Sequence, residues 1–314
     1  MLSSIFSVGF AVSLLAGMIR LATPILLPAL GQIYTQRAGI LNLGVEGTMT
    51  IGAVSGFICA YKTGNLWLGF LTGIIFGALW STIMAWLSVT MRANQVIAGI
   101  GLNILGGGLA VYIYRVAFGI QSLPPQVEPF AAVRIPVLWE LPVLGPVLFQ
   151  HNILVYLAFL MVAVTWFVME KTTYGLKIKA VGEHPRAADS RGINVAAIRY
   201  SAVILGGAYA GAAGAFLSIG YMNMFTDAIV SGRGFIAVSV VIFARFMPQK
   251  AVWGALLFGF ANALQLRLQA MGVDIASQIM LMLPYVLTIL ALVSASKKAE
   301  FPSAYTKPYS RLER

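Results

Sequence analysis

The chain has 314 residues, of which 59% are hydrophobic and 10% are charged, and its mean hydropathy is +0.86. Because soluble domains carry about a quarter charged residues, this composition excludes a water-soluble globular protein and indicates an integral membrane protein. One cysteine and two histidines exclude an internal disulfide and argue against a metal site, and we expect neither a metal nor a cofactor.

The formal net charge of +11 would suit a nucleic-acid partner, but the distribution of the charges argues against one. Eleven of the 21 Lys and Arg residues fall in two polar stretches, Lys171–Arg199 and Lys297–Arg314, and the others are scattered singly between apolar runs. Basic loops between apolar runs stay on the cytoplasmic side of a membrane. The charge therefore predicts topology and contact with lipid, with no nucleic acid bound.

Apolar runs recur along the whole chain, and a spanning helix needs about 20 apolar residues. The first run lacks a basic region before it, so it predicts a retained helix rather than a cleaved signal peptide. It also contains Arg20, Pro24 and Pro28, which indicates one span plus a broken or re-entrant piece. The sequence predicts an all-α membrane domain over residues 1–294, with about eight to ten membrane segments, and a cytoplasmic tail over residues 295–314. The runs are Ile5–Leu30, Leu41–Tyr61, Leu66–Met91, Gln95–Phe118, Asn152–Met169, Tyr200–Tyr221, Ile229–Phe246, Ala251–Leu268 and Ile275–Ser294.

Orientation follows from the two basic stretches. Four runs separate Lys171–Arg199 from Lys297–Arg314, and an even number of spans allows both stretches to be cytoplasmic. The same orientation places the Pro-rich stretch Gln121–His151 outside. It places four further cations inside, namely Arg37, Arg92, Arg245 and Lys250.

Small residues recur at every fourth position of three predicted helices, where they let helix backbones approach closely in lipid. We interpret these faces as packing within one subunit, with a dimer interface as the alternative. The three sets are Gly69, Gly73 and Gly77; Gly206, Ala210 and Gly214; and Ala255, Gly259 and Ala263.

The segment from Ala38 to Gly47, AGILNLGVEG, places an acid at the start of a membrane run. Glu46 follows Asn42 by four residues, which predicts that both lie on one helical face. A carboxylate near hydrocarbon needs a partner, water or a helix N-terminus. Two interpretations stay open, a pathway or gating element and a structural helix cap.

A second charged opening lies in the other half of the chain. Arg233 stands between Gly232 and Gly234, directly before an apolar run, and so parallels the segment around Glu46. Interrupted segments at corresponding positions of two halves are typical of inverted-repeat transporters with a central site. We therefore expect two pseudo-symmetric halves with short re-entrant or broken helices.

The polar stretch 171–199 predicts a short helix at Pro185–Asp189, with Gly182 before it and Gly192 after it. A short cytoplasmic helix between two spans is suited to dock onto a partner. The alternative is a solvated basic loop held near anionic lipid.

Polar side chains inside other runs are candidates for a substrate pathway, because Asn and Gln both donate and accept hydrogen bonds. Hydrogen bonds between helices would explain each of them equally well. The pathway candidates are Asn42, Glu46, Asn103, Asn223, Arg233, Asn262 and Gln265.

No G-x-x-x-x-G-K-[ST] phosphate loop, no H-E-x-x-H motif and no Ser-His-Asp arrangement occurs in the sequence. We therefore do not expect an enzyme, and we expect any ATP hydrolysis to take place on a separate chain. An ion-coupled carrier is the rival class, with Glu46 and Asp227 as its candidate acids.

Three motifs in order resemble a known family. Thr173–Ile193, read TYGLKIKAVGEHPRAADSRGI, resembles the cytoplasmic coupling segment of bacterial ABC importer permeases for branched-chain amino acids, simple sugars and nucleosides. AGILNLGVEG and Gly232–Gln269 resemble the nucleoside branch of that family. His184 departs from the pattern, since relatives commonly have Asn there.

The resemblance implies a permease in the bacterial cell membrane that moves nucleosides, with purine nucleosides first, by alternating access. Simple sugars are the alternative cargo. It further implies cytoplasmic ATPase subunits, a second permease that is a different chain, and an extracytoplasmic substrate-binding lipoprotein. The residues that the resemblance assigns to ATPase coupling are Gly182, Glu183, Pro185, Ala187, Ala188 and Gly192.

Overall fold

A computed structural model of the chain describes residues 8–120, 123–134, 138–271 and 301–310, together with residues 282, 286, 289, 290 and 293. It is a helical bundle with one small sheet. The helices are α2 (Val8–Arg37), α3 (Val45–Thr63), α4 (Leu66–Ala85), α5 (Gln95–Phe118), α6 (Leu144–Leu148), α7 (Ile153–Lys171), α8 (Thr173–Glu183), α9 (Pro185–Ser190), α10 (Val195–Ala215), α11 (Arg233–Phe243) and α12 (Pro248–Ala270). The shorter elements are β1 (Ala132–Arg134), a 3₁₀ turn (Leu138–Glu140), β2 (Gln150–Asn152) and the π-helical ends of α4 (Trp86–Thr90) and α10 (Phe216–Tyr221).

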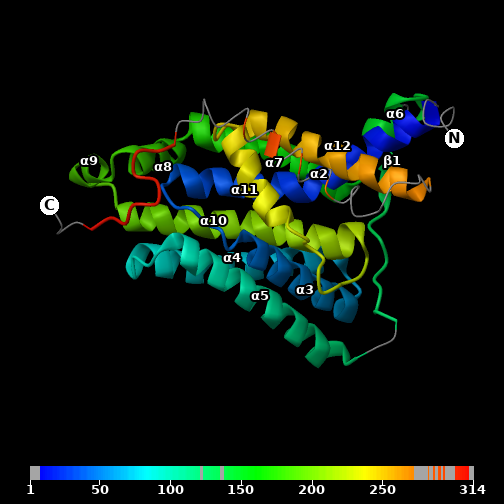
Figure 1. Cartoon of the computed structure of the whole chain (residues 1–314), viewed down its shortest axis with the longest axis horizontal. Coiled ribbons are helices and arrows are strands. Elements are labelled where there is room, and N and C mark those ends of the chain that lie inside the picture. The colour runs from blue at the N-terminus through cyan, green and yellow to red at the C-terminus, as the bar shows by residue number, and fades with distance from the viewer. Residues whose placement is uncertain are drawn as a thin grey trace.

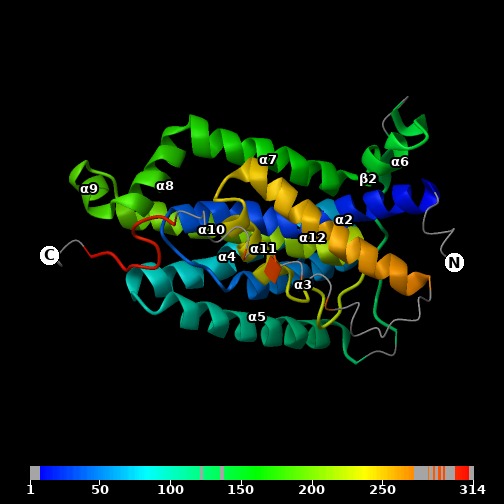
Figure 2. The same ribbon diagram turned by 45° about the horizontal axis from the view of Figure 1, so that its top comes forward.

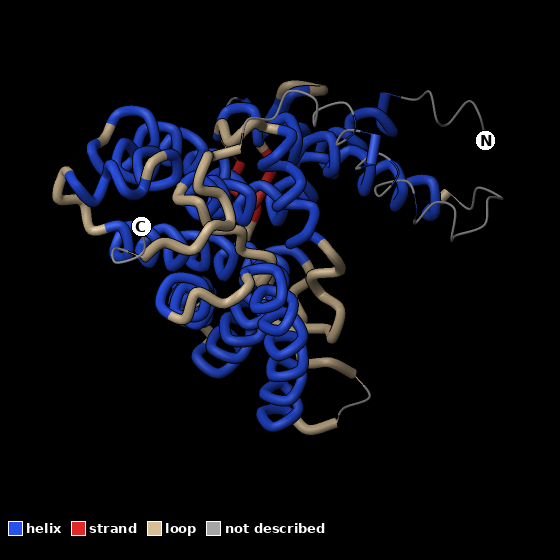
Figure 3. The backbone as a smooth tube through the Cα atoms, turned by 60° about the vertical axis from the view of Figure 1, so that its left-hand side comes forward, coloured by secondary structure: helices blue, strands red, loops and turns tan. Residues whose placement is uncertain are grey.

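The long helices run along the longest axis of the molecule, as Figure 1 shows. We call one end of the bundle the α9 end, where α8, α9 and the C-terminus lie, and the other the α6 end, where α6 and the N-terminus lie. The turned view in Figure 2 separates α7 and α5, which lie on opposite sides of the bundle. Figure 3 brings the α9 end forward and shows the loop that leads to the C-terminus lying across the ends of the helices.

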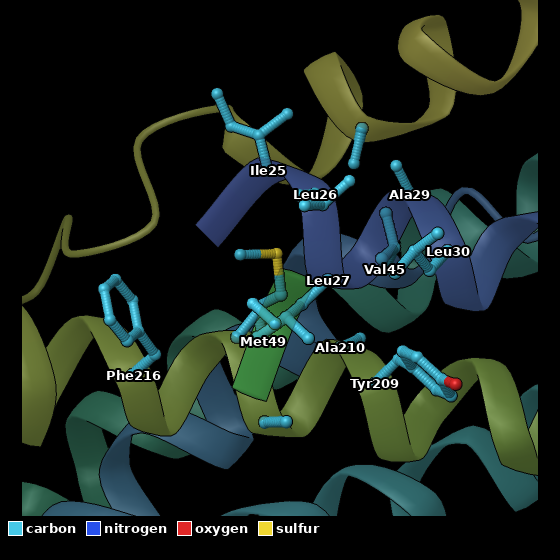
Figure 4. Close-up of a cluster of buried hydrophobic side chains, with 14 of the residues drawn as sticks. Ile25, Leu26, Leu27, Ala29, Leu30, Val45, Met49, Tyr209, Ala210 and Phe216 are labelled. Atoms are coloured by element: carbon cyan, nitrogen blue, oxygen red, sulfur yellow. The ribbon is translucent and has the colours of Figure 1, made fainter. Parts of the chain in front are cut away.

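Helix α10 is the centre of the bundle and packs against α2, α3 and α4. With its π-helical end it is 83% buried over its apolar window, whereas α5 is 22% buried and α7 is 28% buried. The core between these helices is apolar (Figure 4). It includes Ile25 and Leu26 of α2, Met49 of α3, and Tyr209 and Phe216 of α10.

Four of the long helices begin at an asparagine. The side-chain oxygens of Asn65, Asn94, Asn152 and Asn194 accept backbone N–H groups in the first turns of α4, α5, α7 and α10. Asparagine is among the best N-cap residues, because its oxygen satisfies an N–H that the helix cannot. These caps explain why the observed helices start within a few residues of the predicted runs.

Close backbone contacts bring α4 and α10 together. A Cβ added to Gly211 would lie 2.2 Å from the carbonyl oxygen of Gly73, and one added to Gly77 would lie 2.6 Å from the carbonyl oxygen of Gly207. Only glycine allows this approach. The predicted face of α4 is therefore confirmed as packing within one subunit, although it meets Gly207 and Gly211 of α10, which were not in the predicted set. The predicted Gly206 and Gly214 pack within the subunit too, but against α2 and α3.

Six helices of the described residues are long and apolar enough to cross a membrane, namely α2, α4, α5, α7, α10 and α12. The expected number of eight to ten is not confirmed. Helix α11 is apolar but has only 11 residues, and the predicted run Ile275–Ser294 lies, apart from five residues, outside the described residues.

The expected break in the first run was wrong. Helix α2 continues for 30 residues through Pro24 and Pro28. Both prolines are buried inside the helix, where neighbouring helices and side chains can compensate for the missing backbone hydrogen bonds.

At the α6 end, β1 and β2 form a two-stranded antiparallel sheet in which Val133 pairs with His151. This sheet connects the stretch after α5 to the start of α7. It was not predicted, because three-residue strands leave no periodic pattern in the sequence.

Candidate functional site

The chain re-enters the bundle after α2. Residues 38–44 are not helical, and α3 begins only at Val45. Asn103 holds this entry: its amide nitrogen donates to the carbonyl of Leu43 at 2.6 Å, and its side-chain oxygen accepts the N–H of Gly47 at 2.8 Å. Because Asn103 lies about a third of the way along α5, α3 starts inside the bundle rather than at its end.

Glu46 joins the starts of α3 and α11. One carboxylate oxygen accepts the N–H of Gly232 at 2.6 Å, and the other accepts the N–H of Gly234 at 2.7 Å. The carboxylate thus caps the N-terminus of α11, where the helix dipole favours a negative charge. A Cβ added to Gly234 would lie 2.7 Å from the second oxygen, so the contact leaves little room for a larger residue. We call this contact the Glu46 junction.

Arg233 folds back over the loop that precedes α11. Its guanidinium donates to the carbonyls of Ile229 and Val230, each at 3.0 Å. This places a cation within electrostatic reach of Glu46. The sequence parallel between the two Gly-flanked charges therefore corresponds to a physical meeting of the two segments.

Asn42 does not share a helical face with Glu46, so that prediction was wrong. Asn42 is buried in the non-helical entry, and its side-chain oxygen accepts the N–H of Gly44 at 2.8 Å. This two-residue turn competes with a helix, and it explains why α3 starts three residues after Asn42.

The remaining pathway candidates lie elsewhere. Asn223 has a left-handed backbone after α10, and its carbonyl accepts the N–H of Val127. Asn262 donates to Phe258 within α12, and Gln265 is buried in the same helix. The hydrogen bonds of the described residues do not connect these three to the Glu46 junction.

At the α9 end, the predicted short helix is present as α9, and Gly192 follows it with a φ of +80°. Gly182 was predicted as the boundary before the short helix, but it lies inside the amphipathic helix α8. A Cβ added to Gly182 would lie 1.9 Å from the carbonyl oxygen of Arg37, so α8 touches the end of α2 through this residue.

The six coupling candidates divide into an inner and an outer set. Gly182 and Ala188 are buried, and Glu183 accepts hydrogen bonds from the backbone and side chain of Ser303. Ala187 and Gly192 are exposed, and Pro185 is half-buried. The inner set therefore positions the α8–α9 unit, and the outer set is accessible to a partner.

Arg199 is the last residue of the polar stretch Lys171–Arg199, yet it is a buried residue of α10 with 1% exposure. Its guanidinium donates to the carbonyl of Ala38 at 3.2 Å and to that of Lys307 at 3.1 Å. The signal in the sequence was helical spacing, because Val195, Ala202 and Val203 share its buried face.

These features define a polytopic helical membrane protein with two helices that start inside the bundle and a short helix displayed at one end. Residues 14–292 match the family described as the permease component of the branched-chain amino acid transport system. The chain belongs to this family and is an integral membrane protein.

Three relatives align with the chain over nearly their whole lengths. The chain is 37% identical over 304 residues to the guanosine ABC transporter permease protein NupQ of Bacillus subtilis, covering 93% of this chain and 95% of NupQ. It is 34% identical over 300 residues to the nucleoside ABC transporter permease protein NupC of Lactococcus lactis, covering 93% and 94%. It is 39% identical over 329 residues to TsgC13 of Haloferax volcanii, an ABC transporter permease whose name assigns it to glucose, covering 96% and 98%.

A solved structure shares the fold. It is an inward-facing ABC transporter described as of the metal-chelate type, with a TM-score of 0.54 and 13% sequence identity, covering 89% of this chain and 85% of the other. The expected ABC permease fold is thereby confirmed.

Proposed function

We propose that the chain is the membrane-spanning subunit of an ATP-driven importer for nucleosides, with purine nucleosides as the first candidates. Relatives named for guanosine and for nucleosides align with it over nearly their whole lengths. The substrate would cross by alternating access, without covalent chemistry.

The proposal rests above all on the Glu46 junction. Helices α3 and α11 both start inside the bundle, so their positive N-terminal ends and the loops before them can line a cavity, as in transporters with discontinuous helices. Two backbone hydrogen bonds to one carboxylate hold the starts of these helices together. Breaking those bonds would let α3 and α11 separate, which is the movement that an alternating pathway needs.

We assign the α9 end to the cytoplasm, where separate ATPase subunits would dock on the exposed residues Ala187 and Gly192 and on Pro185. The absence of a phosphate loop from the sequence supports a separate ATPase. A substrate-binding lipoprotein would deliver cargo at the α6 end. The second permease would be a different chain, because NupQ and NupP, both guanosine permeases of Bacillus subtilis, resemble this chain at 37% and 26% identity.

Simple sugars are the second candidate cargo, favoured by the similarity to TsgC13. An ion-coupled carrier has less support. Both oxygens of Glu46 already accept backbone N–H groups, and Asp227 is an exposed residue 3.7 Å from Arg115.

The test is uptake of radiolabelled guanosine, adenosine, uridine, ribose and glucose in cells that lack this chain, compared with cells that carry it. A parallel culture is depleted of ATP while its ion gradients are maintained. We expect guanosine and adenosine uptake to fall to background in both the deletion and the ATP-depleted cells.

Loss of sugar uptake alone would keep the ATP-driven mechanism and change the cargo to a sugar. Uptake that survives ATP depletion but stops when the ion gradients collapse would refute the importer and support the ion-coupled carrier.

A further inference from the structure

Residues 301–310, which we call the tail segment, lie against the α8–α9 unit. The N–H of Ala304 donates to the carbonyl of Gly182 at 2.9 Å, and the hydroxyl of Ser303 donates to Glu183 at 2.9 Å. Further along, the hydroxyl of Tyr309 donates to Asp189 of α9 at 2.9 Å. The tail segment therefore contacts both helices of the unit.

The same segment is also tied to the end of α2. The N–H of Thr306 donates to the carbonyl of Gly39 at 2.9 Å. The guanidinium of Arg199 connects the carbonyl of Ala38 to the carbonyl of Lys307, from a fully buried position between them. Four parts of the chain thus meet here: the loop after α2, the α8–α9 unit, the start of α10 and the tail segment.

Two surface hollows flank α9, and the tail segment lines both. The first has a volume of about 510 Å³ and is lined by Glu183–Ala187 of the α8–α9 unit and by Ser303, Ala304 and Lys307–Ser310 of the tail segment. The second has a volume of about 530 Å³ and lies between the end of α4 and the start of α10, with Tyr309 and Ser310 again in its wall.

We propose that the tail segment forms one continuous docking surface with α9 for the ATPase subunit, an inference that rests on the proposed function. A protein that covers the exposed residue Ala187 enters the first hollow, whose opposite wall is the tail segment. Such a partner must therefore also contact Lys307 or Pro308, both of which are exposed. Through Arg199, a displacement of this surface is passed to the loop after α2, which leads to the Glu46 junction.

The occupant of this surface is a protein rather than lipid. The first hollow contains the carboxylate of Glu183, the guanidinium of Arg186 and the hydroxyl of Ser303, besides the exposed ammonium of Lys307. A mixed set of charges and hydrogen-bonding groups at the end of the bundle matches the rim of a protein interface.

The experiment compares single-cysteine variants of the full chain in the assembled transporter. Cys59, the one native cysteine, is replaced by serine, and cysteine is introduced as Ala187→Cys, Lys307→Cys or Pro308→Cys. Lys250→Cys at the start of α12 is the matched control, since Lys250 is exposed but lines neither hollow. Inside-out vesicles are treated with a membrane-impermeant maleimide, either with the ATPase subunits bound or after their removal, and the labelling rates are compared.

We expect bound ATPase to slow labelling at positions 187, 307 and 308 by the same several-fold factor and to leave position 250 unchanged. Protection at 187 without protection at 307 and 308 would overturn this inference and leave the proposed function intact. Equal protection at all positions including 250 would also overturn it, because the partner would then cover the face without using this surface. Protection at none of them would refute the docking of an ATPase on α9, and the proposed function with it.

Discussion

Glu46 and Gly232 are 186 residues apart in the chain, yet a carboxylate oxygen of Glu46 lies 2.6 Å from the backbone nitrogen of Gly232 in the Glu46 junction. A carboxylate is suited to this contact because it can accept hydrogen bonds from two N–H groups at once, and because its negative charge is attracted to the positive N-terminal end of α11. A neutral amide side chain of the same shape has one oxygen acceptor and no negative charge.

We predict that Glu46→Gln reduces transport strongly and destabilises the protein by about 1.5–3 kcal/mol, since it removes the charge and turns an NH₂ group toward a backbone N–H donor. Uptake per unit of membrane protein and thermal unfolding in detergent measure the two effects. Glu128→Gln is the control, because Glu128 is exposed, and it should change stability by less than about 0.5 kcal/mol. Full transport by Glu46→Gln would contradict a role of the junction in the pathway.

His151 of β2 is a second residue from which a prediction follows, namely how stability depends on pH. Burial lowers the pKa of His151 below its ordinary value of 6.5, and the nearby Arg20 lowers it further, although a hydrogen bond to the carbonyl of Val147 opposes both. The folded state therefore prefers the neutral imidazole. Its contribution to stability is complete above pH 6.5 and is lost as the pH falls below that value, because the unfolded state binds the proton first.

We expect hydrogen exchange in α6 and β2, normalised for the intrinsic effect of pH, to become faster between pH 7.5 and pH 5.5, a range of about one unit on each side of the ordinary histidine pKa. In a His151→Gln variant the protection of the same amides should not depend on pH. An unchanged pH dependence in that variant would assign the effect to another group.

At the scale of elements, α8 packs on the end of α2 through Gly182, and this contact fixes the angle at which α9 is displayed. A Cβ at position 182 would lie 1.9 Å from the carbonyl oxygen of Arg37. Backbone cannot move aside as a flexible side chain can, so the two helices would have to separate.

Gly182→Ala should therefore lower ATP-driven uptake and destabilise the contact by about 1–3 kcal/mol, the usual cost of overpacking. Gly101→Ala in α5 is the matched control, because it makes the same change within a helix where nothing lies within 4 Å of the new Cβ. That control should be neutral or should gain up to about 1 kcal/mol from helix propensity. Equal behaviour of the two variants, in uptake and in thermal unfolding, would show that the α8–α2 contact has no functional role.

Elements with a strong local signal were predictable. The bounds of α5 coincide with the predicted run Gln95–Phe118, because Asn94 caps its start and Gly119 ends it with a positive φ. Helix α9 was predicted from Pro185 and from the glycine after it, which are local signals as well. By contrast, α8 was missed, because three charged residues and two glycines obscure its amphipathic pattern.

The long-range contacts of the candidate site could not be read from the sequence. The parallel between the segments at Glu46 and Arg233 indicated that both were special, but not that the carboxylate of one caps the helix of the other. The apolar spacing around Arg199 indicated a buried helical face, but nothing in the sequence indicated its partners, which are the backbone carbonyls of residues 38 and 307.

At the scale of the whole molecule, the non-helical entry before α3 decides the topology. Helices α2 and α4 run in the same direction along the bundle, so the chain between them must return from the α9 end to the α6 end. Residues 38–44 cover part of that distance without forming a helix, and α3 covers the remainder. The end of α3 near Lys62 therefore lies toward the α6 end. Glu128 lies there too, because the N–H of the preceding Val127 donates to the carbonyl of Asn223 after α10. Lys250 lies toward the α9 end, because the nearby Phe246 packs against the guanidinium of Arg37 at the end of α2.

With the α9 end in the cytoplasm, we predict that an impermeant maleimide labels Lys62→Cys and Glu128→Cys in intact cells but does not label Lys250→Cys, all in the Cys59→Ser background. Inside-out vesicles should give the reverse pattern, since all three positions are exposed. We expect this orientation because Lys and Arg are in excess around the α9 end, and loops rich in Lys and Arg stay in the cytoplasm. Labelling of Lys250→Cys in intact cells would show that the molecule has the opposite orientation in the membrane. The α8–α9 unit would then lie outside, where no ATPase can reach it. Labelling of Lys62→Cys from the cytoplasmic side alone would instead show that α3 does not complete the crossing that residues 38–44 begin.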